Sequence, residues 1–135
     1  MESVDRITVD PAVMDGRPCI RGMGVTVGTV LGLRAQQLTG PKVWVLIGDA
    51  ELDEGSVHEA IAYAGPTGLE QLHTVVIDNA SASHARPGGI AARFEAAGWS
   101  VASVDGHDHE ALFTAFTAPH PGRPRAVVAH VEAKF

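Results

Sequence analysis

From residue 42 onward, short apolar runs alternate with stretches in which apolar and polar positions recur at helical spacing. Four runs have the apolar, β-rich character of strands in a parallel sheet: residues 43–47, 74–77, 99–104 and 126–131. Three stretches have one apolar helical face: residues 56–64, 90–97 and 112–116. This alternation predicts an α/β fold, with a three-layer parallel sheet of about four strands and right-handed crossover helices.

The start of the first helix carries a recognisable capping pattern. Ser56 is followed three residues later by Glu59, which is the spacing of a capping box. Ser56 is therefore the predicted N-cap, and Gly65 and Pro66 are expected to end the helix.

Residues 1–40 have a different pattern. Two short extended pieces, 6–9 and 25–30, flank a turn rich in Gly and Pro, and a short helix is predicted over 27–37. Thr39-Gly40-Pro41 contains turn-forming residues, which we expect to end whatever element precedes them. The sequence thus predicts an N-terminal segment of residues 1–40 and a domain of residues 41–135.

Composition narrows the class of protein. With 45% hydrophobic and 19% charged residues, the chain is neither a disordered tail nor a charge-rich coiled coil. The net charge of −6 argues against nonspecific nucleic-acid binding. The uncharged run of residues 23–33 is too short to cross a bilayer, and the lone Cys19 fits a reducing compartment. We therefore expect a soluble, cytoplasmic protein without a membrane partner.

Oxygen-bearing side chains follow two of the predicted strands. Asp49 comes after residues 43–47, and Asn79 comes after residues 74–77. Ligands of open parallel sheets bind beyond the carboxyl ends of the strands, and Mg²⁺ prefers such oxygens. This pattern suggests a metal–phosphate site. The alternative, which the pattern alone favours, is that Asp49 caps a turn and Asn79 adopts a left-handed loop conformation.

Several motifs in order carry a resemblance to a known family. Gly48-Asp49-Ala50 is followed about thirty residues later by Asn79, and residues 105–108 read Asp-Gly-His-Asp. From about Val43 to Phe135 the chain resembles the diphosphate-binding domain of transketolases, whose first motif is Gly-Asp-Gly where this chain has Ala50. The family's topology would place the four strands in the order first, second, fourth, third.

The resemblance implies a cofactor, a metal and their ligands. The cofactor would be thiamine diphosphate with Mg²⁺. Asp49 and Asn79 would bind Mg²⁺ through their side chains, and Ser81 would bind it through its backbone carbonyl. Gly48 and Ala50 would line the diphosphate. The activity would be transfer of two-carbon units between sugars, with a sugar phosphate as substrate; no catalytic residue is assigned.

The resemblance covers only part of the family's cofactor-binding machinery, so it implies that a partner chain supplies the rest. Nothing before Lys42 resembles the earlier strands of the family's domain, and the second domain that activates the cofactor has no counterpart. Turnover would therefore require a partner chain. The strand at residues 43–47 would also be an exposed edge, which we expect the N-terminal segment or a second copy of the chain to cover.

The N-terminal segment has a resemblance of its own. Residues 5–11, 16–22 and 25–27 are similar to the start of a small bacterial family of antitoxin-like proteins, whose later DNA-binding helices are missing here. The alternative function is therefore a noncatalytic chimeric remnant or an antitoxin-like DNA-binding protein.

Overall fold

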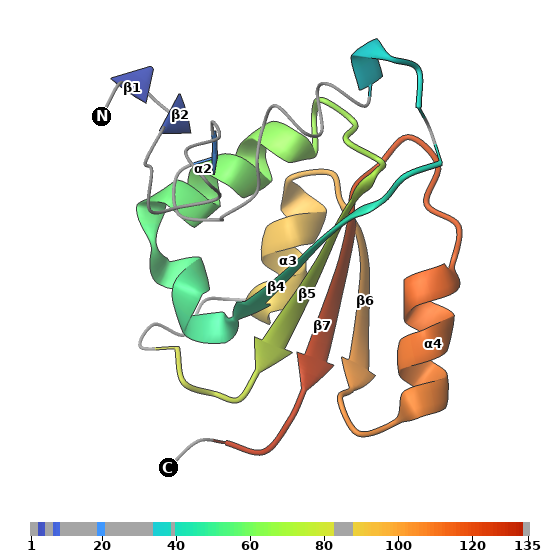
Figure 1. The fold of residues 1–135 in the computed structure, drawn as a ribbon. Helices are drawn as coiled ribbons and strands as arrows, with labels where there is room; N and C mark the ends of the chain where they lie inside the picture. Colours follow the sequence, from blue (N-terminus) through green and yellow to red (C-terminus); the bar gives the residue numbers. More distant parts are fainter. Residues whose placement is uncertain are drawn as a thin grey trace.

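The computed structural model describes residues 3–4, 7–8, 19–20, 34–38, 40–82 and 88–133 (Figure 1). Near the N-terminus, three two-residue strands form an antiparallel sheet in the order β1-β2-β3: β1 (Ser3–Val4), β2 (Ile7–Thr8) and β3 (Cys19–Ile20). The extended piece expected at residues 6–9 thus contains β2. The piece expected at 25–30 and most of the helix expected at 27–37 lie outside the described residues.

The main sheet is the predicted one. Its strands are parallel and lie in the order β4-β5-β7-β6: β4 (Val43–Gly48), β5 (Leu72–Asp78), β7 (Arg125–His130) and β6 (Ser100–Asp105). This order, first, second, fourth, third along the chain, confirms the α/β fold with a four-stranded parallel sheet. Successive residues of a strand point to opposite faces, so each strand contributes to two layers.

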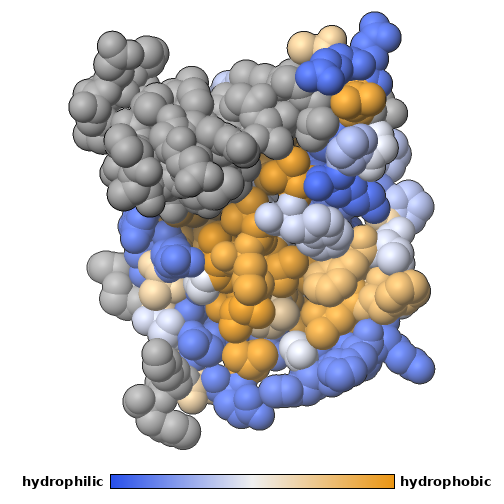
Figure 2. Space-filling model, viewed as in Figure 1, coloured by the Kyte–Doolittle hydropathy of each residue, from blue (hydrophilic) through white to orange (hydrophobic). Residues whose placement is uncertain are grey.

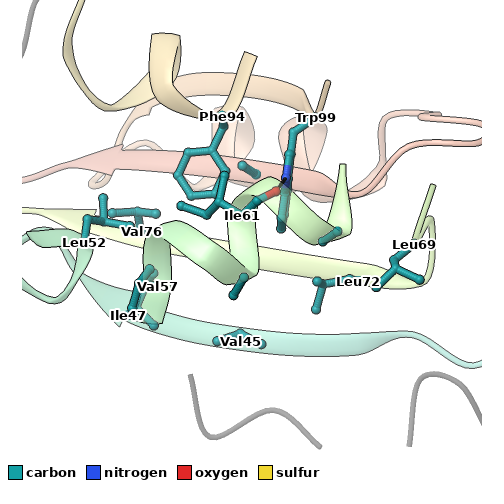
Figure 3. Packing of buried hydrophobic residues seen from close by; sticks show 13 residues of the cluster. Val45, Ile47, Leu52, Val57, Ile61, Leu69, Leu72, Val76, Phe94 and Trp99 are labelled. Carbon is teal, nitrogen blue, oxygen red and sulfur yellow. Dashed lines mark hydrogen bonds between the residues drawn. The ribbon is translucent and has the colours of Figure 1, made fainter. Parts of the chain in front are cut away.

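Helices cover the two faces unequally. One face of the sheet packs against α2 (Gly55–Ala64) and α3 (Gly89–Ala96), and α4 (His109–Thr117) lies against the other face beside β6 and β7 (Figure 1). On the first face, Val45 and Ile47 of β4 join Val57 and Ile61 of α2 in the main core (Figure 3). The apolar stripe predicted for α2 is buried. In the stripe predicted at residues 112–116, by contrast, Phe113 of α4 is 69% exposed.

Two aromatic residues link α3 to the core. Phe94 and Trp99 are both buried and meet edge to face, with ring centroids 5.0 Å apart. The indole Nε1 of Trp99 donates a 3.0 Å hydrogen bond to the carbonyl of Ile61, so its one polar atom is satisfied inside the core (Figure 3).

The start of α2 differs from the prediction. The N-cap is Glu54, the helix begins at Gly55, and no side chain caps it, so the assignment of Ser56 as N-cap was wrong. The reason lies in the preceding 3₁₀ turn, η2 (Asp49–Asp53), which leads almost directly into α2: Glu54 N–H donates to the Glu51 carbonyl, and Val57 N–H donates to that of Glu54. Backbone bonds from η2 therefore fix where α2 starts.

The second face of the sheet is partly uncovered. Trp44 and Leu46 of β4 are 48% and 70% exposed, and they border a groove of about 550 Å³ that also touches Leu112 and Phe116 of α4. Figure 2 shows hydrophobic residues gathered across this side of the molecule. In the part of the chain that the structure describes, no helix is both long and apolar enough to cross a membrane.

Candidate metal and diphosphate site

The carboxyl ends of β4 and β5 bring the predicted site residues to one edge of the sheet. The two strands are paired in parallel with Gly48 opposite Ile77, so Asp49 and Asn79 both follow directly on this edge. Asp49 is only 1% exposed although it carries a carboxyl group. A buried carboxylate at a strand end requires compensating donors.

The donors come mainly from the turn after β5. Ser81 donates to Asp49 twice, from its hydroxyl to Oδ1 at 2.6 Å and from its backbone N–H to Oδ2 at 2.8 Å. The N–H of Ala82 adds a 3.0 Å bond to Oδ2, and the N–H of Ala50 adds a 3.0 Å bond to Oδ1. The structure thus places Ser81 beside Asp49, where its hydroxyl and N–H contact the carboxylate.

These bonds determine the charge state of the carboxyl group. Burial alone would raise the pKa of Asp49, but the hydrogen bonds from Ser81, Ala82 and Ala50 together outweigh it and hold the pKa below its usual value. Asp49 is therefore ionised at neutral pH, which is the state that a metal ligand needs.

Asn79 presents a different kind of oxygen. Its side-chain Oδ1 is buried, yet it has no hydrogen-bond partner among the described residues. The left-handed conformation expected at Asn79 as an alternative to ligand binding lies instead at Ala80, with φ 54°. An unpartnered buried amide oxygen at the same sheet edge as an ionised carboxylate fits the hard oxygen ligands that Mg²⁺ prefers.

Gly48 and Ala50 flank Asp49 and leave space beside the backbone. A Cβ on Gly48 would meet no atom within 4 Å, and Ala50 is exposed. Among the described non-glycine residues, only Gln37 and Ala80 have positive φ, so Ala50 fills the third position of the family motif without backbone strain. A phosphate group could therefore approach this turn.

Four further residues support this edge through three contacts that the sequence did not reveal. Glu51 Oε2 accepts a 2.7 Å bond from Gly48 N–H, and Arg93 of α3 donates a 2.7 Å bond to the Leu52 carbonyl in η2. Asp78 Oδ2 lies 3.0 Å from Nδ1 of His130, its register partner on β7. Asp78 and His130 end strands at the same level, a signal that becomes readable only when the strand order is known.

The ligand set available for a cation is limited. In the described ranges, no group of three or more His, Cys, Asp or Glu side chains is arranged to hold a metal ion. A cation at this edge would therefore depend on Asp49, on amide and backbone oxygens, and on oxygens from a bound ligand.

Comparison with known proteins adds a family for the N-terminal part. The family model described as "Protein of unknown function (DUF433)" matches residues 7–64. The match includes the N-terminal segment and continues through β4, η2 and α2.

Most of the chain is similar to a bacterial protein named as a ferredoxin. Ferredoxin fas2 of Rhodococcoides fascians is 45% identical over 127 residues, which cover 94% of this chain and 42% of that protein. An iron–sulfur cluster is usually held by four cysteine thiolates, and this chain has one cysteine. This chain therefore lacks the four cysteines that usually hold such a cluster.

Transketolases match most of the chain. Transketolase-like protein 2 of Bos taurus is 35% identical over 121 residues, covering 81% of this chain and 19% of that protein. The crystal structure of transketolase from Campylobacter jejuni matches with a TM-score of 0.63 and 27% identity, covering 84% of this chain and 20% of that one.

These coverages exceed residues 43–135, the stretch whose motifs resemble transketolases. Residues 43–135 are 93 of the 135 residues, fewer than either match covers, so the similarity also includes residues before Val43. The chain spans less than half of the first relative and about a fifth of the transketolases. It is thus a transketolase-related chain whose described sheet has the fold of one part of those enzymes.

Proposed function

We propose that this chain binds Mg²⁺ and the diphosphate of thiamine diphosphate as one part of a transketolase-like enzyme. The observation that carries the proposal is that an ionised, buried Asp49 and the unpartnered buried oxygen of Asn79 both follow paired strands at one edge of the sheet. Both follow neighbouring parallel strands, at the edge where open α/β sheets bind ligands. The similarity to transketolases over most of the chain supports the same assignment.

In this proposal each residue has a binding role. The side-chain oxygens of Asp49 and Asn79 and the backbone carbonyl of Ser81 would coordinate Mg²⁺, and Gly48 and Ala50 would line the diphosphate. Thiamine diphosphate, when bound, supplies the carbanion chemistry for transfer of two-carbon units between sugars. The chain itself holds and orients that group, and it keeps Asp49 ionised through the donors around it.

Catalysis would need residues from outside the part of the transketolases that this chain matches. Because the chain spans about a fifth of the transketolases, we propose that a partner chain or a second copy contributes the remaining contacts to the cofactor and to a sugar-phosphate substrate. Binding by this chain alone should accordingly be weak, with a free energy of about −5 kcal/mol and a dissociation constant of a few hundred micromolar.

Calorimetric titration of the full chain with thiamine diphosphate and Mg²⁺ tests the proposal. Asp49→Asn removes the charge at nearly constant size, and Asn79→Ala removes the unpartnered oxygen; both should abolish measurable binding. Glu54→Gln is the matched control, because Glu54 is an exposed acid at the other end of η2 and its loss of charge is the same. Circular dichroism of each variant verifies that it is folded.

Two results would contradict the proposal. Absence of binding heat with the wild-type chain would mean that the motif is inherited without function. Equal binding by wild type, Asp49→Asn and Asn79→Ala would place the site elsewhere. Tight, salt-sensitive retardation of DNA in a band-shift assay would instead support the antitoxin-like alternative.

A further inference from the structure

We infer that Ser81 and Ala82 act as an internal competitor for the cation, and that the Ser81 hydroxyl sets the affinity of Asp49 for it. This inference rests on the function proposed above. It concerns what must happen to the turn after β5 when a cation binds, which the ligand assignment alone does not address.

The Asp49 carboxylate has no free acceptor position. A carboxylate offers about four lone-pair sites on its two oxygens. Asp49 accepts four hydrogen bonds: Oδ1 takes those from the Ser81 hydroxyl and Ala50 N–H, and Oδ2 takes those from the N–H groups of Ser81 and Ala82. Three of the four donors belong to the same two-residue segment, so that segment occupies the carboxylate much as a cation would.

A cation at Asp49 must therefore displace at least one donor. Mg²⁺ binds oxygens at about 2.0–2.1 Å and requires a lone pair directed at it. The hydrogens on the present donors carry partial positive charge and would repel it. The hydroxyl of Ser81 is the donor that can leave at least cost, because it turns about one side-chain bond and Ser81 is exposed to water, whereas the N–H groups are fixed to the backbone.

The conformation of the turn depends on side-chain acceptors. Ala80 has φ 54°, a left-handed conformation that is uncommon for alanine. Its N–H donates to Asp78 Oδ1 at 3.1 Å, and the next two N–H groups donate to Asp49. These N–H bonds hold residues 81–82 against Asp49, so both amides sense a change at the carboxylate when the Ser81 hydroxyl turns away.

Substitution of the hydroxyl tests the inference. Ser81→Ala keeps the backbone carbonyl proposed as a ligand and removes only the competing hydroxyl. It should bind Mg²⁺ about tenfold more tightly than wild type, a difference of about 1.4 kcal/mol. Ser81→Thr keeps the hydroxyl and should stay near wild type. Ser103→Ala, at an exposed serine of β6, is the matched control and should change nothing.

Titration of the ¹⁵N-labelled full chain with Mg²⁺ alone gives the readout by NMR. The amide signals of Ser81 and Ala82 should shift with saturation, because both N–H groups donate to the carboxylate that the cation would bind. Saturation without movement of those amides, or affinity of Ser81→Ala equal to or below wild type, would overturn the competitor while leaving the proposed site intact. If neither the wild-type chain nor Ser81→Ala shows a saturable shift, both the competitor and the proposed cation site are overturned.

Discussion

Asp49 combines two properties that normally exclude each other, because it is fully buried and ionised. Four hydrogen bonds make this possible. Asp49→Asn should lower the free energy of unfolding at pH 7 by about 2–3 kcal/mol, since one carboxylate oxygen becomes an NH₂ group that faces donors. Denaturant unfolding of the two chains measures the difference.

The same substitution has a predictable pH dependence. The pKa of Asp49 is lowered in the folded chain, so its stabilising effect is present above the unfolded value of about 3.9 and is lost as the pH falls through the lower folded pKa. The stability gap between wild type and Asp49→Asn should therefore narrow below about pH 4. A gap that stays constant from pH 7 to pH 3 would show that the charge of Asp49 is not responsible.

His73 should affect stability at a higher pH than Asp49 does. Its ring is buried, stacks on Trp44 at 4.4 Å, and has no hydrogen-bond partner for either nitrogen among the described residues. Burial, and then the charges of His120, Lys42 and Arg125, lower the pKa of His73 to about 4. The imidazole is thus neutral in the folded chain at pH 7.

A pH-dependent loss of stability follows from this low pKa. Between pH 6.5 and 4 the unfolded chain gains a proton at His73 that the folded chain does not, which costs up to about 3 kcal/mol of stability. His73→Phe, which preserves a ring against Trp44, should flatten the dependence over this interval. Thermal melts at matched pH values check it, and an unchanged slope in the variant would rule out His73 as the source.

At the scale of elements, β4 is the exposed edge of the main sheet. It pairs with β5, and no other described strand pairs with it. Its sequence is uncharged, and Leu46 is 70% exposed beside the apolar groove. An edge of this kind promotes strand pairing between molecules. We therefore expect the chain to self-associate as its concentration rises.

A pair of matched variants tests the role of this edge. Leu46→Glu should shift sedimentation toward the monomer, because it places a charge on the edge strand. Phe113→Glu changes an equally exposed apolar residue of α4, at 69%, that does not line the groove, and it should leave association unchanged. A wild-type chain that remains monomeric at all concentrations would contradict the expectation.

The sequence allowed the elements to be predicted better than their contacts. Runs such as residues 43–47 identify strands by their continuous apolar, β-rich character. The burial on both faces that this character predicts is not found in β4, because Trp44 and Leu46 are exposed. The prediction at Ser56 failed because backbone bonds from η2 start α2 without a side-chain cap. Contacts such as Asp78 with His130 depend on strand order, and the order came from a family resemblance, not from periodicity.

For the site, the sequence indicated the sheet edge at which Asp49 and Asn79 lie, but not the hydrogen bonds that the Asp49 carboxylate accepts there. The positions of Asp49 and Asn79 after two strands were readable, because parallel strands end at one level. The hydrogen bonds from Ser81 and Ala82 were not readable, since they depend on the path of a turn. Ser81 was expected as a carbonyl ligand, and the structure shows its N–H and hydroxyl on the carboxylate; its role toward a metal remains a prediction.

At the scale of the whole molecule, the division at residue 40 stays a proposal. The family match at residues 7–64 spans that position. Two contacts also cross it: Arg34 donates to the Thr67 carbonyl at 3.0 Å, and the buried amide of Gln71 donates to the Leu38 carbonyl. The same amide donates to the carbonyl of Pro41, just after the division. Arg34, Leu38 and Pro41 are therefore held to the amino end of the main sheet, opposite the proposed site.

The central claim is that a divalent cation binds at the edge formed by Asp49 and Asn79. Mn²⁺ favours the same oxygen ligands as Mg²⁺, and it broadens the NMR signals of nearby amides. When Mn²⁺ and thiamine diphosphate are added to the ¹⁵N-labelled full chain, the amides of Gly48, Asp49 and Asn79 should broaden first, and excess Mg²⁺ should reverse the effect. First broadening around the exposed pair His107 and Glu132, or no selective broadening, would contradict it.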